Sequence, residues 1–338
     1  MAADSNKPAT LHDVANLAGV SYQTVSRVIN NSPYVAEETR KRVHRAIKQL
    51  DYRPNRAARS LITGRSQTLQ MINFNSTYTR PVMIFVGATK EFNYHLGISM
   101  LNEPSSQEEL RVLLDEFTSR IVDGFIFFEP PFELNKIDIN RLCRGAPFVQ
   151  VGSCPCPNIP AVVFDQRHGV EQIMNHLLGL GHRQIAEISG ILSNYDGRVR
   201  HEAFLNAVHV AGLKPGPSIE AGFTTPSGYA AACALLDRGE PFTALVCAND
   251  EMALGALRAL HEHGVRVPED ISVTGFDDNV DVPYYEPPLT TVRQDLSVQA
   301  HQSIQYLVTM IEQTETPRYQ QIIFPQLVIR QSTLAPRV

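Results

Sequence analysis

The 338-residue sequence contains no tryptophan and only five cysteines, at positions 143, 154, 156, 233 and 247. Five scattered cysteines are too few for a disulfide framework. Cys154 and Cys156 form one close pair, but no second pair of Cys or His follows at the spacing of zinc ligands. We therefore expect reduced thiols, no bound metal and no cofactor.

Long apolar runs are also missing. None approaches the roughly 18 residues that a membrane-spanning helix needs, and Met1–Thr10 is polar where a secretory signal peptide would be apolar. We expect a cytoplasmic protein without a membrane partner. The motifs G-x-S-x-G, G-x-x-x-x-G-K-S/T, G-x-G-x-x-G and H-E-x-x-H are absent as well. The sequence thus predicts neither an enzyme nor catalytic residues.

Positive charge is scarce in most of the chain and concentrated at its start. Residues 1–66 contain 11 Lys and Arg against 5 Asp and Glu, whereas the remaining residues contain 19 against 30. A basic head on an acidic body indicates that only the head meets a polyanion such as DNA. A solvated basic tail would carry the same charge, so the interpretation depends on the motifs in this segment.

The first fifty residues show the pattern of three short helices. Thr10 and Asp13 have the spacing of a capping box, followed by apolar residues at helical spacing and a glycine. Ser21 is placed to cap a second helix over 22–30, and a third helix is expected over 37–50. Two helices joined by a short turn, with a third in support, predict a helix-turn-helix unit.

The polar residues of the second helix lie off its apolar stripe and therefore point outward. Gln pairs well with adenine and Arg with guanine, so Gln23 and Arg27 are suited to reading base edges. Short polar groups at the start and end of this helix are suited to phosphate contacts. A small helical bundle with a solvated polar face is the alternative. The candidates for DNA contact here are Ser21, Tyr22, Gln23, Thr24, Ser26, Arg27 and Asn30.

A basic stretch over 53–66 follows the third helix. Asn55 is placed to cap a helix of only two turns, which would be marginal in water and is expected to fold only when docked. Leu61 stands among arginines and suits an apolar wedge in the minor groove, although it could instead pack against the body or a partner chain. The candidates for DNA contact here are Asn55, Arg56, Ala58 and Leu61.

These residues resemble the lactose-repressor family of transcription regulators. The resemblance rests on TLHDVANLAGVSYQTVSRVINNSPYVAEETRKRV, followed by YRPNRAARSLITGRS. It implies that Tyr22, Gln23 and Arg27 read bases and that Leu61 intercalates. Ala36 departs from the pattern, because many relatives have a better helix cap there, and it should cost the third helix about 1 kcal/mol.

From Thr68 onward, short apolar runs alternate with helical periods. This alternation predicts parallel sheets with helices on both faces. The stretches HLLGLGHRQIAEISG, FTALVCANDEMALGALRALHEHGVRVPEDISVTGFDD and PPLTTVRQDL resemble the core domain of the same family, which is related to periplasmic sugar-binding proteins. Strands are expected at 69–74, 95–101, 124–128, 148–151, 185–188, 244–247, 271–274 and 322–329, and helices at 82–92, 107–120, 170–178, 200–211 and 251–263.

The expected fold is α/β: an all-α helix-turn-helix head joined to a periplasmic-binding-protein-like core of two doubly wound parallel subdomains. The expected boundaries are 1–53 for the DNA-binding domain and 54–66 for the hinge and linker. The N-terminal core subdomain is expected over 67–163 and 293–322. The C-terminal core subdomain is expected over 164–292 and 323–334.

Ligands of such cores bind in a cleft at the carboxyl ends of the strands. Arg200, Asn249 and Asp277 stand near that edge, and their planar groups match vicinal hydroxyls of a sugar. Asn249 could be only a helix cap and Asp277 only a turn residue. The resemblance implies that these positions bind effector, with the Phe223 ring stacked on the sugar; His168 departs from it, since an acidic residue is expected there. The effector-contact candidates are Phe74, Tyr78, Ile84, His168, Arg200, Phe223, Asn249, Asp277, Gln294 and Leu296.

We therefore predict a sequence-specific repressor that binds operator DNA and is released by a small-molecule effector, a carbohydrate. In the alternative, a purine or phosphoprotein corepressor strengthens operator binding. A sugar-binding protein without DNA function is a remote alternative, because it would have the body without the head. The residues after Ile329 contain no heptad repeat, so we expect a homodimer rather than a coiled-coil tetramer.

Overall fold

The chain forms two compact units, Met1–Gln67 and Thr68–Val338. The computed structural model describes residues 9–29, 32–52, 64–74, 79–101, 107–119, 122–130, 138–152, 154–155, 158–313 and 320–337. Within them, no helix is long and apolar enough to cross a membrane.

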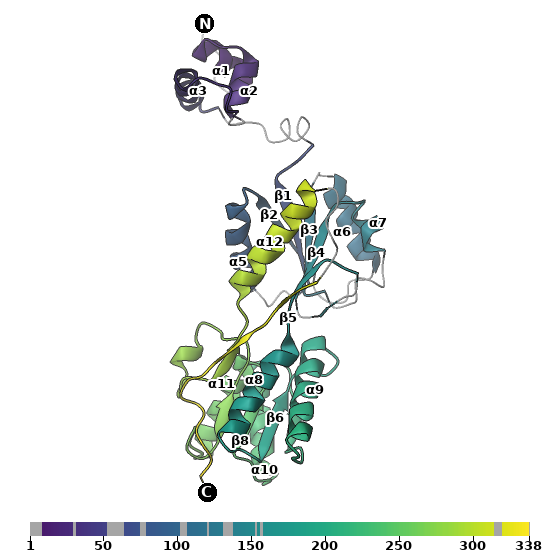
Figure 1. The fold of residues 1–338 in the computed structure, drawn as a ribbon, viewed down its shortest axis with the longest axis vertical. Coiled ribbons are helices and arrows are strands. Elements are labelled where there is room, and N and C mark those ends of the chain that lie inside the picture. The colour runs from purple at the N-terminus through teal and green to yellow at the C-terminus, as the bar shows by residue number, and fades with distance from the viewer. Residues whose placement is uncertain are drawn as a thin grey trace. The chain divides into compact units, whose positions relative to one another are not determined.

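The described part of the head contains the predicted helix-turn-helix (Figure 1). The capping box is present, since the Thr10 N–H donates to the Asp13 carboxylate at 2.8 Å while the Asp13 N–H donates back to the Thr10 hydroxyl at 3.3 Å. Ala36 makes no side-chain cap, as expected. Val14, Val25 and other buried residues form one small core that fixes the helices against each other. The helices are α1 Leu11–Ala18, α2 Tyr22–Ile29 and α3 Glu37–Gln49.

The N-terminal part of the core is built on a parallel sheet with the strand order β11-β5-β4-β3-β1-β2 among the described residues. Figure 1 shows α5 and α12 on one face of this sheet and α6 and α7 on the other. The strands are β1 Thr68–Asn73, β2 His95–Met100, β3 Gly124–Phe128, β4 Phe148–Gly152, β5 Ala161–Phe164 and β11 Gln320–Ile323. The helices are α5 Thr79–Glu91, α6 Gln107–Ser119, α7 Ile139–Leu142 and α12 Leu296–Glu312.

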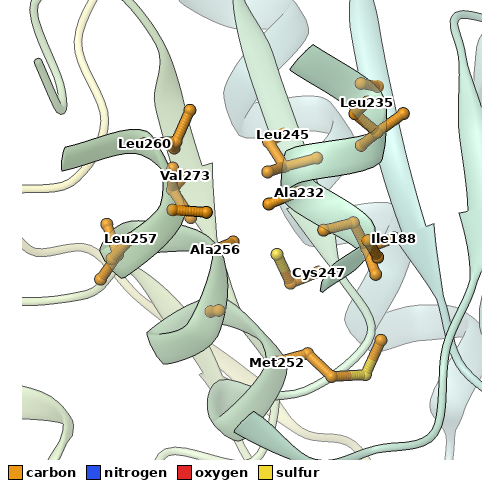
Figure 2. Close-up of a cluster of buried hydrophobic side chains, with 14 of the residues drawn as sticks. Ile188, Ala232, Leu235, Leu245, Cys247, Met252, Ala256, Leu257, Leu260 and Val273 are labelled. Atoms are coloured by element: carbon orange, nitrogen blue, oxygen red, sulfur yellow. The ribbon is translucent and has the colours of Figure 1, made fainter. Parts of the chain in front are cut away.

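The C-terminal part is built on a second parallel sheet with the order β7-β6-β8-β9. Helices α8 and α9 pack in a cluster on one face, and α10 and α11 pack on the other, around the buried side chains of Figure 2. The strands are β6 Ile185–Ser189, β7 Ser218–Glu220, β8 Ala244–Cys247 and β9 Ser272–Thr274. The helices are α8 Gln166–Gly179, α9 Tyr195–Val210, α10 Thr225–Asp237, α11 Asp250–Glu262 and the 3-10 turn η2 Val282–Tyr284.

The chain crosses between the two parts after β5, after β10 (Thr291–Arg293) and after β11. The single strand predicted over 322–329 is wrong. β11 ends at Ile323, and β12 (Gln326–Val328) pairs with β10 in a separate antiparallel ladder. Pro325 lies between them and lacks the N–H that a continuous ladder would need.

The helix predicted over 200–211 begins five residues earlier, at Tyr195. Its first turn contains Asp196, Gly197 and Arg198, which carry no apolar periodicity. Packing sets the start instead, because a Cβ at Gly197 would lie 2.2 Å from the Ile191 carbonyl oxygen. Arg200 consequently lies in the second turn of α9. The sequence had predicted that Arg200 would be the first residue of this helix, which is wrong.

Candidate functional site

The recognition helix α2 buries one face and exposes the other. Val25 and Val28 are fully buried in the head core, whereas the side chains of Tyr22, Gln23 and Arg27 are exposed. The Tyr22 ring lies 5.5 Å from the ring of His12 on α1, between ring centroids. The exposed face therefore presents an aromatic, an amide and a guanidinium group on one surface.

Two of the predicted phosphate contacts also cap the helix. Thr24 donates its N–H to the Ser21 hydroxyl at 3.2 Å, and the two hydroxyl oxygens lie 2.9 Å apart. Ser26 is half-buried. The predicted contacts Asn30, Asn55, Arg56, Ala58 and Leu61, and the effector candidate Tyr78, lie outside the described residues.

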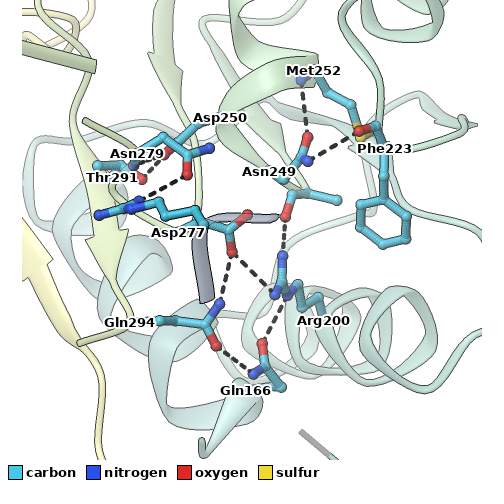
Figure 3. A network of polar contacts seen from close by, with 12 residues as sticks. Gln166, Arg200, Phe223, Asn249, Asp250, Met252, Asp277, Asn279, Thr291 and Gln294 are labelled. Atoms are coloured by element: carbon cyan, nitrogen blue, oxygen red, sulfur yellow. Dashed lines mark hydrogen bonds and ion pairs between the residues drawn. The ribbon is translucent and has the colours of Figure 1, made fainter. Parts of the chain in front are cut away.

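Arg200 is the centre of the polar network of Figure 3. Its side chain is buried, and it donates Nε to the Gln166 Oε1 at 2.9 Å, Nη1 to the Ala248 carbonyl and Nη2 to the Asp277 carboxylate at 3.4 Å. Its guanidinium carbon also lies 3.9 Å from the ring centroid of Phe276. These contacts fix the guanidinium on the C-terminal subdomain, where it supports the scaffold.

Asp277 lies beyond the carboxyl end of β9, in a backbone conformation with φ 112°. Its carboxylate accepts hydrogen bonds from Arg200 and from the Gln294 amide, the latter at 2.7 Å. Burial raises the pKa of this carboxyl to about 6, against the lowering effect of Arg200, and the carboxylate of Asp196 raises it further. Burial therefore opposes the ionisation of Asp277, whereas Arg200 and Gln294 favour it.

Asn249 both caps a helix and holds the segment that carries Phe223. Its Oδ1 accepts the Met252 N–H at 2.9 Å at the start of α11, and its Nδ2 donates to the Phe223 carbonyl at 3.2 Å. The Phe223 ring packs over Gly190, where a Cβ would lie 2.1 Å from the ring. Gly190 directly follows β6, and Figure 3 shows the hydrogen bond that joins Asn249 to the segment of Phe223. The ring thus lies at the carboxyl edge of the sheet.

A cavity of about 270 Å³ lies where the two core subdomains meet. Ile84 from α5, with Gln294 and Leu296 from the crossover, lines it, and Gln294 also belongs to the Arg200 network. Across the same cavity, the Arg80 Nη1 donates to the Asn279 Oδ1 at 3.2 Å. Three predicted contacts therefore line one cavity between the subdomains.

Two other predicted contacts have mainly structural neighbours. Phe74 packs against the apolar cluster beneath α6 and α7. The His168 ring packs edge-on against Phe324, with 5.2 Å between ring centroids, and its backbone N–H donates to the capping Asp165.

Sequence reasoning missed Gln166 and Glu129. Gln166 is almost fully buried, accepts from Arg200 and donates to the Gln294 Oε1 at 2.8 Å, so it links α8, α9 and the crossover. Glu129 directly follows β3, and burial holds the pKa of its carboxyl well above the usual range. Each residue lies at the carboxyl end of a strand or just beyond it. Because ligands of such folds bind at that edge of the sheet, the sequence could have indicated both residues as candidates for the site.

A second carboxylate cluster supports the loop that carries Asp277. Asp278 accepts from Arg293 and from Arg330, each at 2.6 Å, and so ties β10 and the segment after β12 to the loop. Asp250 is fully buried and accepts from the Thr291 hydroxyl at 2.6 Å; burial raises the pKa of its carboxyl to about 8. Within the described residues, no three His, Cys, Asp or Glu side chains could hold a metal ion.

Comparison with known proteins gives matches over nearly the whole chain. Residues 10–55 match the model of the bacterial regulatory proteins of the lacI family, and residues 174–333 match a periplasmic binding protein-like domain. The lactose operon repressor of Escherichia coli K12 is 34% identical over 98% of this chain and 92% of its own length. The transcriptional repressor PurR of Haemophilus influenzae PittEE is 35% identical over 96% of this chain and 98% of its own length.

A solved structure extends the match to the fold. The Lac repressor dimer bound to operator and the anti-inducer ONPF superimposes with a TM-score of 0.87 at 32% identity, covering 97% of this chain and 100% of that chain. A helix-turn-helix head on a two-part α/β ligand-binding core defines a DNA-binding transcriptional repressor rather than an enzyme. This chain belongs to the lacI family of bacterial regulatory proteins.

Proposed function

We propose that this protein is a cytoplasmic repressor that binds a pseudo-palindromic operator as a homodimer and leaves it when a carbohydrate enters the core. The observation that carries this proposal is the polar cluster of Arg200, Asp277 and Gln294 beside the cavity between the subdomains. Planar groups with paired donors and acceptors suit the vicinal hydroxyls of a sugar. The operator-bound dimer of a relative supports the homodimer.

On the DNA side, Gln23 and Arg27 would read base edges in the major groove, with Tyr22 beside them. Ser21 and Thr24 would orient the helix on the phosphates. Residues 54–66 would form the hinge and enter the minor groove through Leu61. We keep 67–163 with 293–322, and 164–292 with 323–334, as the proposed core subdomains.

On the effector side, Arg200 and Asp277 would hold adjacent hydroxyls from the C-terminal subdomain. Asn249 would contribute its amide, and the Phe223 ring would stack on the apolar face of the sugar. Ile84 and Leu296 would close the cavity from the N-terminal subdomain and the crossover.

The PurR relatives favour a second candidate, in which a purine corepressor tightens operator binding. The two candidates differ in sign. A ligand that lowers operator affinity prefers the core conformation that releases DNA, whereas a corepressor prefers the conformation that holds it.

The test is operator affinity, measured by fluorescence anisotropy, with and without lactose, galactose, cellobiose, hypoxanthine and guanine. A sugar should lower the affinity by about 5- to 150-fold, and Asp277→Asn should bring this ratio close to one. Glu240→Gln is the matched control, because Glu240 is exposed in the loop before β8, at the opposite end of that strand from the cleft. Tighter operator binding with a purine, and no sugar effect, would replace the inducer by the corepressor.

A further inference from the structure

Glu129 lies at the edge of the N-terminal sheet that faces the cleft. Its backbone N–H donates to the Val151 carbonyl at 2.8 Å, with φ at 49°. The neighbouring strand β4 ends at Gly152, where a Cβ would lie 3.0 Å from the carboxyl carbon and from both carboxyl oxygens of Glu129. The glycine therefore leaves the space over the strand end that the Glu129 carboxyl group occupies.

Charged groups of the C-terminal subdomain act on this carboxyl group. Burial raises the pKa of Glu129, the carboxylates of Asp196 and Asp277 raise it further, and Arg200 opposes them. Glu129 follows β3 and Asp277 lies beyond β9, so each stands at the carboxyl edge of its own parallel sheet, where the cleft of such folds lies; Glu129 therefore faces the Arg200 network from the other subdomain.

Asp196 completes the cluster. It lies one turn before Arg200 on α9, and its buried Oδ1 has no hydrogen-bond partner among the described residues. The Arg200 guanidinium already donates to Gln166, Ala248 and Asp277. Among the described residues, the Asp196 Oδ1 is thus left without a donor, and a ligand hydroxyl could supply one.

We propose that Glu129 contacts the effector and restricts it to saccharides without negative charge. The proposal rests on the proposed function, because it assigns a chemical class to the ligand of that site. A hydroxyl group of an uncharged sugar supplies the donor that the Asp196 Oδ1 lacks and can also donate to Glu129. A sugar acid or sugar phosphate would bury another anion beside them, where the Arg200 guanidinium is already engaged. Arg293 and Arg330, which line the neighbouring cavity, are paired with Asp278.

The test is isothermal titration of the full-length protein with matched pairs: galactose and galacturonate, cellobiose and cellobionate, glucose and glucose 6-phosphate. For every neutral sugar that binds, its anionic partner should bind at least about tenfold more weakly, since a charge a few ångströms from a half-buried carboxylate costs that much or more. Glu129→Gln keeps the shape of the side chain but cannot ionise. Because the pKa of Glu129 is raised, the discrimination should grow with rising pH in the wild type and should grow less in this variant. Glu240→Gln should leave the discrimination unchanged.

Two outcomes overturn this proposal and leave the proposed function standing. In the first, an anionic sugar binds the wild type as tightly as its neutral partner. In the second, Glu129→Gln discriminates between neutral and anionic sugars as the wild type does, while neutral sugars still release operator. A protein that neither binds nor responds to any saccharide overturns the proposed function and this inference together. Reduced discrimination in Glu129→Gln, with operator release by neutral sugars, supports both.

Discussion

Replacing Asp277 by asparagine should make the stability of the core depend less on pH. Burial raises the pKa of Asp277 to about 6 from its ordinary 3.8, so the folded protein holds this proton more tightly than the unfolded chain does. The resulting stabilisation is fully present below about pH 3.8 and is lost as the pH rises through about 6. A pKa change of this size corresponds to about 3 kcal/mol.

An asparagine has no proton to lose at these pH values. The free energy of unfolding of Asp277→Asn, relative to wild type, should therefore become more positive by about 3 kcal/mol between about pH 4 and pH 8. Asp277→Asn also loses the ion pair with Arg200, which lowers the free energy of unfolding of the variant. This loss matters mainly at high pH, where the wild-type pair is ionised, and it reduces the expected increase of about 3 kcal/mol. The sign of this slope is the decisive quantity.

The assay is urea unfolding followed by circular dichroism across this pH range, with Glu240→Gln as the control. The free energy of unfolding of this control should follow the same pH dependence as that of the wild type, because Glu240 is exposed. A difference between Asp277→Asn and wild type that stays constant or shrinks with rising pH would refute the argument that Asp277 is ionised at a cost.

Two further predictions concern the recognition helix and the core. Gln23→Ala and Arg27→Ala should each cost about 1–3 kcal/mol of operator binding and relax specificity at one base pair. Arg45→Ala on α3 should instead weaken binding to all DNA sequences alike. If selection on random DNA returns an unchanged base preference for Gln23→Ala and Arg27→Ala, these assignments are wrong. Gly228→Ala should lower the free energy of unfolding by about 1–3 kcal/mol, because a Cβ there would lie 2.3 Å from the Met252 carbonyl oxygen, while Gly222→Ala meets nothing closer than 3.7 Å. Equal melting of these two glycine variants would show that α10 and α11 can separate without cost.

Local patterns sufficed for the head and for most of the core. The capping pair Thr10 and Asp13 is three residues apart, so the sequence alone brings the two side chains together. The strand Ala244–Cys247 is a buried apolar run between polar segments, and its predicted bounds agree with β8. Such features depend on neighbours in the chain, which a single sequence displays.

Tertiary contacts were harder to predict. Gln166 meets Gln294 across 128 positions of sequence, and no local pattern pairs two glutamines at that separation. Glu129 reads as an ordinary turn residue before a proline until the fold sets it over Gly152. The start of α9 at Tyr195 likewise goes with the close approach of Gly197 to the backbone of Gly190 and Ile191, which apolar periodicity does not reveal.

The arrangement of the cluster bears on how a ligand could act on DNA binding. Arg200 is held by three hydrogen bonds within the C-terminal subdomain, so a ligand does not have to order it. Glu129 belongs to the other subdomain, and its interaction with Asp196 and Asp277 is repulsive when all are ionised. A sugar that donates to both sides replaces this repulsion with attraction and favours approach of the subdomains. The ligand gains binding free energy when the subdomains approach. By linkage, this contact cannot weaken operator binding by more than that gain, and such coupling free energies are typically about 1–3 kcal/mol.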